Sequence, residues 1–290
     1  LSVERFIFDT DRTYIMNLYK QFMMDQTDFN QKYSFRLKTK DNSICWVEFS
    51  SVPIVWNGKS AGLLFLNNIN EKKLTEELKE LLISISNNYI NASVDLLEET
   101  INNSLEEIGR FVNADRSYVF EYDWFANECN NTFEWCNEGI DSEIENLQNV
   151  STVLIPQWVT SHQMNKPMFV DNVSDLEIDD PLRQILEPQG IKSLITIPMI
   201  DGDKCVGFVG FDSVVNYHLY SEKEKFLLKV FAQMIVNLKN RWLSNELLKS
   251  QISLQKLVNE ISSDMISADN NNIDTKIKSM LQKTGEFFNV

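Results

Sequence analysis

Residues 191–212 read IKSLITIPMIDGDKCVGFVGFD, two apolar runs separated by Asp201-Gly202-Asp203. An Asp-Gly pair between apolar runs favours a β-hairpin, because these residues tolerate a positive φ. We therefore predict one strand in each run, over 191–200 and 204–212. The two glycines inside the second run, Gly207 and Gly210, indicate a close backbone approach there.

Further elements are predicted on both sides of this hairpin. The segment after it predicts a helix running past residue 242, because Ser221 and Glu224 have the spacing of a capping box. The segment before it predicts a strand at 115–123, a neighbouring strand at 132–136 and, within irregular structure, a strand near 168–171.

The first 70 residues predict a helix followed by three strands. Residues 1–29 carry apolar side chains at helical spacing. Alternating apolar residues over 32–39, 44–56 and 61–69 predict strands, and Asn57-Gly58 predicts a hairpin between the last two.

Two amphipathic helices are predicted between these regions. From Glu71 onward, apolar residues fall at spacings of four, three and four, which is a seam that pairs helices. A second helix with one apolar stripe follows it. The seam consists of Leu74, Leu78, Leu81 and Ile85, and the stripe consists of Val94, Leu97, Ile101, Leu105, Ile108 and Val112.

An internal repeat links the middle of the chain to its last residues. Residues 85–114 resemble residues 261–290 without a gap, at a constant offset (261 − 85 = 176). Besides apolar positions, the two segments share a Gly-x-Phe-x-Asn ending that starts at Gly109 and Gly285. We interpret residues 261–290 as the truncated start of a second copy of the middle domain. The chain is then expected to be a fragment of a serial multidomain protein.

The composition excludes several classes of partner. The chain has 290 residues and a net charge of −15, which predicts no nucleic-acid binding because phosphate backbones bind to basic surfaces. No apolar run reaches the roughly 18 residues that span a bilayer, and no signal peptide is visible. We expect a cytoplasmic protein with no membrane contact in this fragment. The four cysteines are expected to be reduced thiols, and no metal site is predicted.

The first part of the sequence resembles the C-terminal half of a PAS domain. Asn68 stands where an Asp is usual in the family's exit motif into a signalling helix. The earlier strands and the cofactor-facing helices of the family are missing, so the resemblance implies no ligand here. The matching residues are 6–12, 35–41, Trp46, Pro53 and 68–73.

Residues 84–245 resemble a GAF domain of the kind found beside PAS domains in bacterial histidine kinases and diguanylate cyclases. The resemblance implies an α+β fold with an antiparallel sheet flanked by helices, which agrees with the predicted order of elements. It rests on residues 114–118, 134–136, 139–140, 156–158, 189–194, 197–198 and 207–212. We divide the chain into a partial PAS domain (1–70), a linker helix (71–93), a GAF domain (94–247) and a linker with the start of a second GAF-like repeat (248–290).

These resemblances imply a sensory module of a signal-transduction protein, without catalytic residues of its own. It would sense a small molecule, form a homodimer through helices 71–93 and 220–258, and relay the signal to a kinase or diguanylate cyclase domain elsewhere. Two alternatives stay open. One is a structural dimerisation spacer with no ligand, and the other is a GAF-fold thiol reductase that uses Cys129 and Cys136.

GAF domains often bind a small molecule between the sheet and the irregular segment, in an apolar pocket with a few polar groups. The same aromatic side chains would otherwise simply fill the core. The candidate pocket residues are Phe120, Trp135, Trp158, Phe169, Asp171, Arg183, Ser193 and Phe211.

The resemblance leaves the ligand unidentified. Covalent bilin is not expected, because the family attaches it through a Cys-His pair at the place held here by Pro181-Leu182. Asn165-Lys166 and Phe169 match the signature of cyclic-nucleotide-binding members only in part. Haem is not expected either, because it needs an axial ligand and the sequence offers only the lone His162 there.

Overall fold

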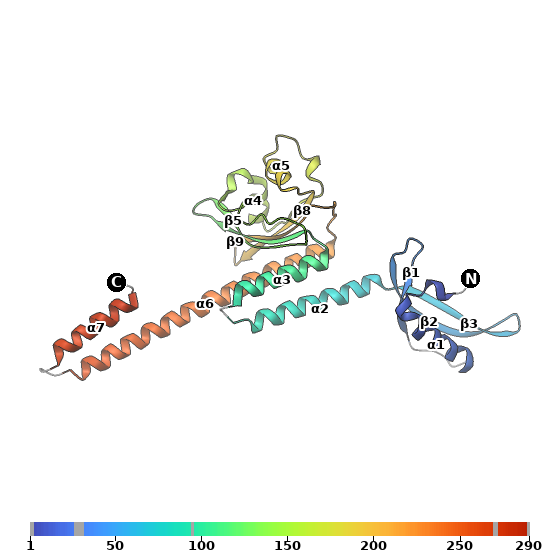
Figure 1. Cartoon of the computed structure of the whole chain (residues 1–290), viewed down its shortest axis with the longest axis horizontal. Helices are drawn as coiled ribbons and strands as arrows, with labels where there is room; N and C mark the ends of the chain where they lie inside the picture. The colour runs from blue at the N-terminus through green and yellow to red at the C-terminus, as the bar shows by residue number, and fades with distance from the viewer. Residues whose placement is uncertain (1–2, 26–31, 94–95, 269–271, 289–290) are drawn as a thin grey trace. The chain divides into compact units, whose positions relative to one another are not determined.

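The computed structural model describes residues 3–25, 32–93, 96–268 and 272–288. The chain forms two compact units, Leu1–Ile83 and Ser84–Val290, whose elements are labelled in Figure 1. No helix within the described ranges is long and apolar enough to cross a membrane.

The first unit is a three-stranded antiparallel sheet in the order β1-β2-β3. Asn57 and Gly58 have φ angles of 51° and 73° in the turn between the last two strands, as the Asn-Gly signal predicts. The predicted N-terminal helix is confirmed over residues 9–25, and its residues 26–29 lie outside the described ranges. The elements are η1 (Val3–Phe6), α1 (Asp9–Asp25), β1 (Tyr33–Lys38), β2 (Ile44–Trp56) and β3 (Lys59–Asn68).

The second unit contains a six-stranded antiparallel sheet in the order β6-β5-β4-β9-β8-β7. The predicted hairpin of residues 191–212 forms β8 and β9, with Gly202 at a φ of 59° in its turn. The strands are β4 (Arg116–Asp123), β5 (Glu128–Cys136), β6 (Val150–Ser151), β7 (Met168–Val170), β8 (Ser193–Asp201) and β9 (Lys204–Ser213).

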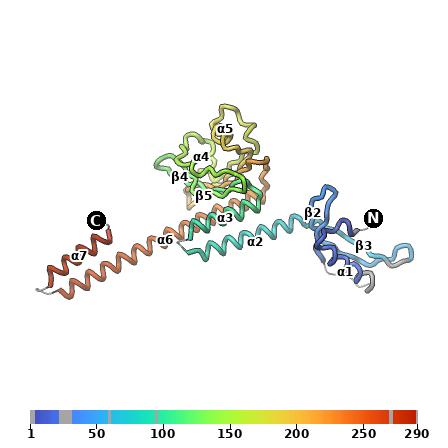
Figure 2. The backbone as a smooth tube through the Cα atoms, viewed as in Figure 1, coloured from blue at the N-terminus to red at the C-terminus, as the bar shows by residue number. Residues whose placement is uncertain are grey.

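Helices cover both faces of this sheet (Figures 1 and 2). One face packs on α3 (Leu97–Val112) and on the first part of α6 (Glu222–Ile266), and we call it the α3–α6 face. The other carries α4 (Pro156–Gln163) and α5 (Pro181–Leu186), and we call it the α4–α5 face. Three 3-10 turns complete this side, η3 (Thr152–Leu154), η4 (Val173–Asp175) and η5 (Glu187–Gln189).

Helix α6 begins at the predicted capping box. The Ser221 side chain accepts a hydrogen bond from the Glu224 backbone N–H at 3.4 Å, and the Glu224 carboxylate accepts one from the Ser221 N–H at 2.6 Å. The helix then continues for 45 residues. Because a helix start leaves N–H groups unpaired, this reciprocal pair fixes where the helix begins.

The internal repeat is visible in the helix boundaries. Adding 176 to the bounds of α3 gives 273 and 288, which are the bounds of α7 (Ile273–Phe288). The helix before α3, α2 (Asn70–Asn91), ends at a position equivalent to 267, and α6 ends at Ile266. The sequence similarity therefore corresponds to the same helix–break–helix arrangement.

Glycines allow close packing at the centre of the second unit. A Cβ at Gly207 would lie 2.1 Å from the Phe120 carbonyl oxygen, which confirms the predicted close backbone approach. On α3, a Cβ at Gly109 would lie 2.5 Å from Cζ3 of Trp135. The indole of Trp135 thus occupies the space that a side chain on α3 would need.

We predict that Gly109→Ala destabilises the protein by about 1–3 kcal/mol, because the new methyl group meets the rigid indole of Trp135. This loss exceeds the gain of about 1 kcal/mol that alanine brings to a helix. Urea unfolding followed by circular dichroism measures the difference. The exposed Asn103→Ala on the same helix is the control, and equal stability of the two variants would contradict the close packing.

Candidate functional site

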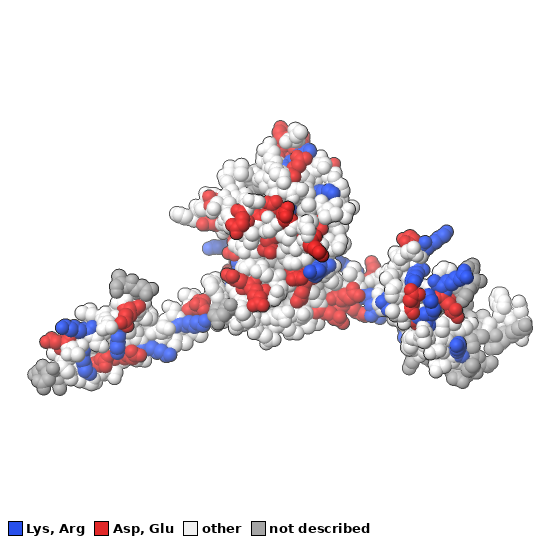
Figure 3. Space-filling model, in the orientation of Figure 1, with Lys and Arg blue, Asp and Glu red and all other residues white. Residues whose placement is uncertain are grey.

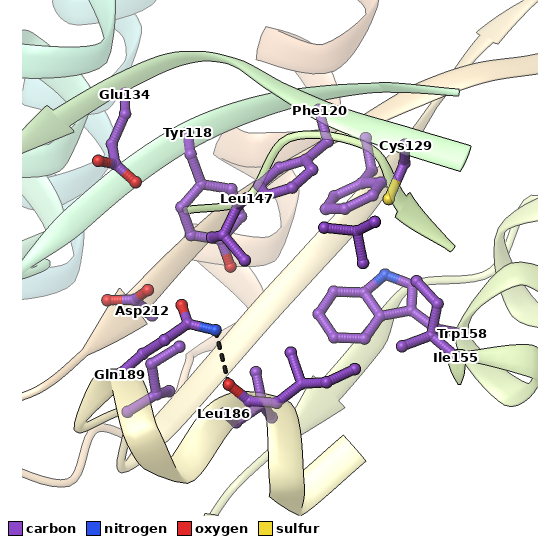
Figure 4. A pocket seen from close by; sticks show the side chains of 14 residues that line it. Tyr118, Phe120, Cys129, Glu134, Leu147, Ile155, Trp158, Leu186, Gln189 and Asp212 are labelled. Carbon is purple, nitrogen blue, oxygen red and sulfur yellow. Dashed lines mark hydrogen bonds between the residues drawn. The ribbon is translucent and has the colours of Figure 1, made fainter. Parts of the chain in front are cut away.

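A small pocket lies between the α4–α5 face of the sheet and the segments that cover it (Figure 4). Its volume is about 50 Å³, which holds a few water-sized groups. Drug-sized ligands need about 300 Å³ or more, so a larger molecule would require the walls to move. The lining residues are Tyr118, Phe120, Cys129, Glu134, Leu147, Val150, Ile155, Trp158, Ile185, Leu186, Gln189, Ile191, Phe208 and Asp212.

Stacked aromatic rings line the pocket. Tyr118 and Phe120 point to the same face of β4 because side chains alternate along a strand. Phe208 on the neighbouring strand β9 stacks on Phe120, with ring centroids 4.7 Å apart and planes 7° from parallel. Trp158 from α4 closes the opposite side, with its ring centroid 5.5 Å from that of Phe208. These aromatic walls suit a ligand that carries a flat apolar group.

One end of the pocket is polar because a buried ion pair lies there. The Arg116 side chain is 2% exposed, and its Nε lies 3.1 Å from both Asp212 carboxylate oxygens. The same guanidinium donates to the backbone carbonyls of Gln189 at 3.3 Å and Asp141 at 3.5 Å. Burial is the main influence on Asp212 and raises its pKa to about 7, while Arg116 opposes that rise.

Glu134 fixes the loop that covers the pocket. Its Oε2 accepts hydrogen bonds from the backbone N–H groups of Glu143 at 2.8 Å and Ile144 at 3.2 Å, and from the Ser142 hydroxyl at 2.6 Å. Leu147 follows in this loop and lines the pocket. The Glu134 carboxylate is therefore used in holding the loop rather than left free for a ligand.

The Trp158 indole N–H is the unpaired donor of the pocket. Trp158 is 6% exposed, and within the described residues its Nε1 has no hydrogen-bond partner. A buried donor without a partner costs about 1–3 kcal/mol. A ligand with an acceptor at this place would remove that cost.

His162 lies on the same helix as Trp158, α4, and is fully buried. Its Nδ1 lies 2.9 Å from the Tyr122 hydroxyl and its Nε2 lies 3.0 Å from the Thr196 hydroxyl. Burial lowers the pKa of His162 to about 3. Both ring nitrogens are thus engaged within the protein, so in this arrangement neither is available as an axial ligand.

Of the eight residues predicted for the pocket, the structure brings two to it, Phe120 and Trp158. Trp135, Phe211 and Ser193 lie on the α3–α6 face. The first two are the strand partners of Ser117, whose side chain points away from the pocket. Trp135 packs on Gly109, and Phe211 stacks on Tyr220 at 6.4 Å. Ser193 is the third, and its hydroxyl accepts from the His218 N–H at 2.9 Å.

The remaining three predicted residues lie at the surface. Phe169 is half exposed beneath the ammonium group of Lys225, and Asp171 is exposed. Arg183 pairs with Glu187 at 3.0 Å and donates to the Leu176 carbonyl at 2.8 Å. The three residues are not among those that line the pocket.

Sequence reasoning missed Tyr118, Phe208, Glu134, Gln189 and Asp212 as pocket residues. Alternation along β4 from Phe120 would have indicated Tyr118, and the pairing of Phe120 with Phe208 gives the third ring. All five lie within the stretches that carry the family resemblance.

The proposed thiol pair is not formed. Cys129 and Cys136 lie seven positions apart on one strand, β5, which places their Cα atoms about 20 Å apart. The Cα atoms of a disulfide lie within about 7 Å of each other. Burial raises the pKa of each thiol to about 12, which opposes the thiolate that redox chemistry needs. This geometry overturns the thiol-reductase alternative.

A larger hollow of about 930 Å³ lies between α3, α6 and β5. It is open, and Lys239 within it forms an ion pair with Glu121. It has no aromatic stack comparable to that of the enclosed pocket, which is therefore the better candidate for a small ligand.

Comparison with known proteins identifies this unit. Residues 96–237 match the model of the GAF domain family. The methanogenesis regulatory histidine kinase FilI of Methanothrix harundinacea is 30% identical over 144 residues, which are 48% of this chain and 16% of that kinase.

Solved structures show the same fold. A bacteriophytochrome of R. palustris has a TM-score of 0.60 at 10% identity over 99% of this chain. The photosensory core module of Stigmatella aurantiaca phytochrome has a TM-score of 0.58 at 12% identity over 98% of this chain. The chain covers 59% of each of these two proteins.

We predict that stability falls as the pH falls below about 6.5, in part through His162. In the unfolded chain this histidine binds a proton near pH 6.5, whereas in the folded protein it does so only near pH 3. Acid therefore favours unfolding, with a contribution of about 2 kcal/mol between pH 7.5 and pH 5. Urea unfolding at both pH values should show a smaller loss in His162→Gln than in wild type. His218→Gln is the control, and the same loss in all three proteins would contradict the prediction.

Proposed function

Because residues 96–237 form a GAF domain, we propose that this chain is the sensory module of a signal-transduction protein and that its enclosed pocket receives a small molecule. The observation that carries the proposal is the buried Trp158 N–H without a partner, beside a cavity lined by stacked rings. The proposal assigns no reaction to this chain. The output domain, a kinase or a diguanylate cyclase, would lie elsewhere in the parent protein.

The pocket favours a compact and mostly apolar ligand. A cavity of about 50 Å³ accepts only a few non-hydrogen atoms unless the loop that carries Leu147 moves. The ligand needs a hydrogen-bond acceptor that faces the Trp158 N–H. At the other end, the Gln189 amide donates one N–H group to the Ile185 carbonyl (Figure 4), which leaves its second N–H group and its carbonyl oxygen beside Asp212.

We propose that helices α2 and α6 carry the response. Asp212 at the pocket is followed closely by Val214 and Val215, whose N–H groups both donate to the Asp115 carboxylate. Helix α6 begins seven residues later, at Glu222. A change at the pocket would thus reach α6 through a short and hydrogen-bonded connection. The response would be a shift between two packings of the helices.

Arg241 links these two helices within the second unit. Its guanidinium, on α6, donates to the backbone carbonyls of Tyr89 at 2.6 Å, Ile90 at 2.9 Å and Ala92 at 3.1 Å at the end of α2. A cation at a helix C-terminus is favourable because the helix dipole is negative there. We propose that this contact couples the incoming helix to the outgoing one.

We also propose that the module is a homodimer. Along α6 beyond the sheet, Leu247, Leu254 and Val258 are 67%, 43% and 47% exposed. Their spacings of seven and four residues place them along one side of the helix, as in a coiled-coil seam. Acidic and basic side chains intermingle around this part of the chain (Figure 3), which suits a helix that pairs with a copy of itself.

Residues 1–70 would contribute a partial PAS domain, and the module would act in the cytoplasm.

We predict that native mass spectrometry of the purified protein detects a bound small molecule at one per chain. Trp158→Phe keeps most of the ring but removes the N–H, and should weaken binding of that molecule about 5–10-fold. Trp135→Phe, on the other face of the sheet, is the control and should bind normally. No bound molecule, together with no hit in a thermal-shift screen of metabolites, would support the ligand-free spacer instead.

We predict that the double variant Leu247→Glu, Leu254→Glu converts a dimer into a monomer, because four like charges would meet in the seam. Sedimentation velocity measures the mass in solution. The control is Asn245→Glu, which places a charge on the opposite side of α6 and should leave the dimer intact. A wild-type protein that stays monomeric at high concentration would contradict the dimer.

A further inference from the structure

Helix α7 presents an apolar face that the described part of the chain leaves exposed. Ile101 and Leu105 on α3 are 0% and 1% exposed, because β4 and β5 cover them. Their equivalents on α7, Ile277 and Leu281, are 37% and 62% exposed. Val112 corresponds to Phe288, which is also exposed. Burying such side chains is favourable, and this face has the residue pattern of one that a sheet covers.

The position of α7 is fixed on the side away from this face. Lys283 forms ion pairs with Asp264 at 3.0 Å and Glu260 at 3.5 Å on α6. In the first copy, the equivalent helices α2 and α3 are joined by a hydrogen bond of 2.6 Å between Tyr89 and Ser104. The equivalent positions of the second copy hold Met265 and Met280. The hydrogen-bonded pair of the first copy is thus replaced by two methionines in the second copy. A joint replacement is expected where the two positions face each other.

A glycine on α7 occupies the position of Gly109 on α3. Glycine weakens a helix interior because it loses more backbone freedom on folding than other residues. On α3, Gly109 is justified by the indole of Trp135, which lies where its Cβ would be. Gly285 occupies the same place on α7. By analogy with Gly109, it would leave room for an aromatic side chain.

From these observations we infer that α7 and the last turns of α6 form the helical half of a second domain of the same fold. The exposed face of α7 is the docking surface for an antiparallel sheet supplied by the polypeptide that follows it. That sheet places a bulky ring against Gly285. The source in the same polypeptide follows from the first copy, where β4 starts four residues after α3 ends. This inference goes beyond the proposed function, because it concerns neither the pocket nor the dimer seam.

A helix exchange within this chain tests whether α7 is built to cover such a sheet. Residues 97–112 are replaced by the sequence of residues 273–288, together with Tyr89→Met to restore the methionine pair. We expect cooperative unfolding, with a melting temperature within about 10 °C of wild type. The control carries the same sixteen residues in reverse order, and should lose cooperative unfolding. A chimaera that behaves like the reversed control would overturn the inference.

Two further measurements test the inference if the chimaera fails to fold for another reason. In the chimaera, replacement of the transplanted glycine by leucine should abolish folding or lower the melting temperature, because Trp135 needs that space. In the full-length parent protein, the amides of α7 should exchange with deuterium at least about 100-fold more slowly than in the 290-residue chain. Equal exchange rates would overturn the docking of a following sheet.

A second copy of this chain is the alternative occupant of the exposed face of α7. The variant Leu281→Asp in the 290-residue chain distinguishes it by sedimentation velocity. An unchanged mass is expected, since the face is open in this chain. A dimer that dissociates on this substitution would show that a second copy covers α7, and would overturn the inference.

Discussion

The Arg116 guanidinium is a full positive charge held at 2% exposure, and the polar end of the pocket is arranged around it. A buried charge is tolerated only when it is paired and its remaining donors are satisfied. Asp212 supplies the pairing, and the carbonyls of Asp141 and Gln189 take the other donors. The loop after β5 and the turn after α5 are therefore brought together at one point. The hydrogen bonds of Glu134 hold the first of these segments as well, so the loop over the aromatic stack is fixed from two directions.

In the sheet of the second unit, alternate side chains face the pocket on one side and helix α6 on the other. Along β9, Phe208 and Asp212 line the pocket, whereas Phe211 packs toward α6. Successive residues of a strand point to opposite faces, so the pocket and the long helix contact adjacent residues of one backbone. Under the proposed function, a displacement of β9 by a ligand would act directly on the residues that face α6. Such a displacement would provide a physical basis for the proposed signal transfer.

Helix α6 belongs to two structures at once. Its first half completes the GAF domain, where Leu227, Phe231 and Ile235 are buried. Its last turns contact α7 through the ion pairs of Lys283 with Glu260 and Asp264. The two regions are joined by one continuous helix from Glu222 to Ile266. A rotation or shift produced at the pocket would therefore be delivered to whatever α7 supports.

The sequence by itself determined features whose cause is local. The β8–β9 turn rests on Gly202, the start of α6 rests on Ser221 and Glu224, and the bounds of α7 follow from the repeat. Only the tertiary structure decided which side chains form the pocket. Phe120 and Phe211 are similar in sequence context, but the strand register turns one toward the pocket and the other toward α6. Likewise, Cys129 and Cys136 are close in sequence, yet one extended strand holds them apart. Register and face depend on pairing between distant strands, and that pairing cannot be read from neighbouring residues.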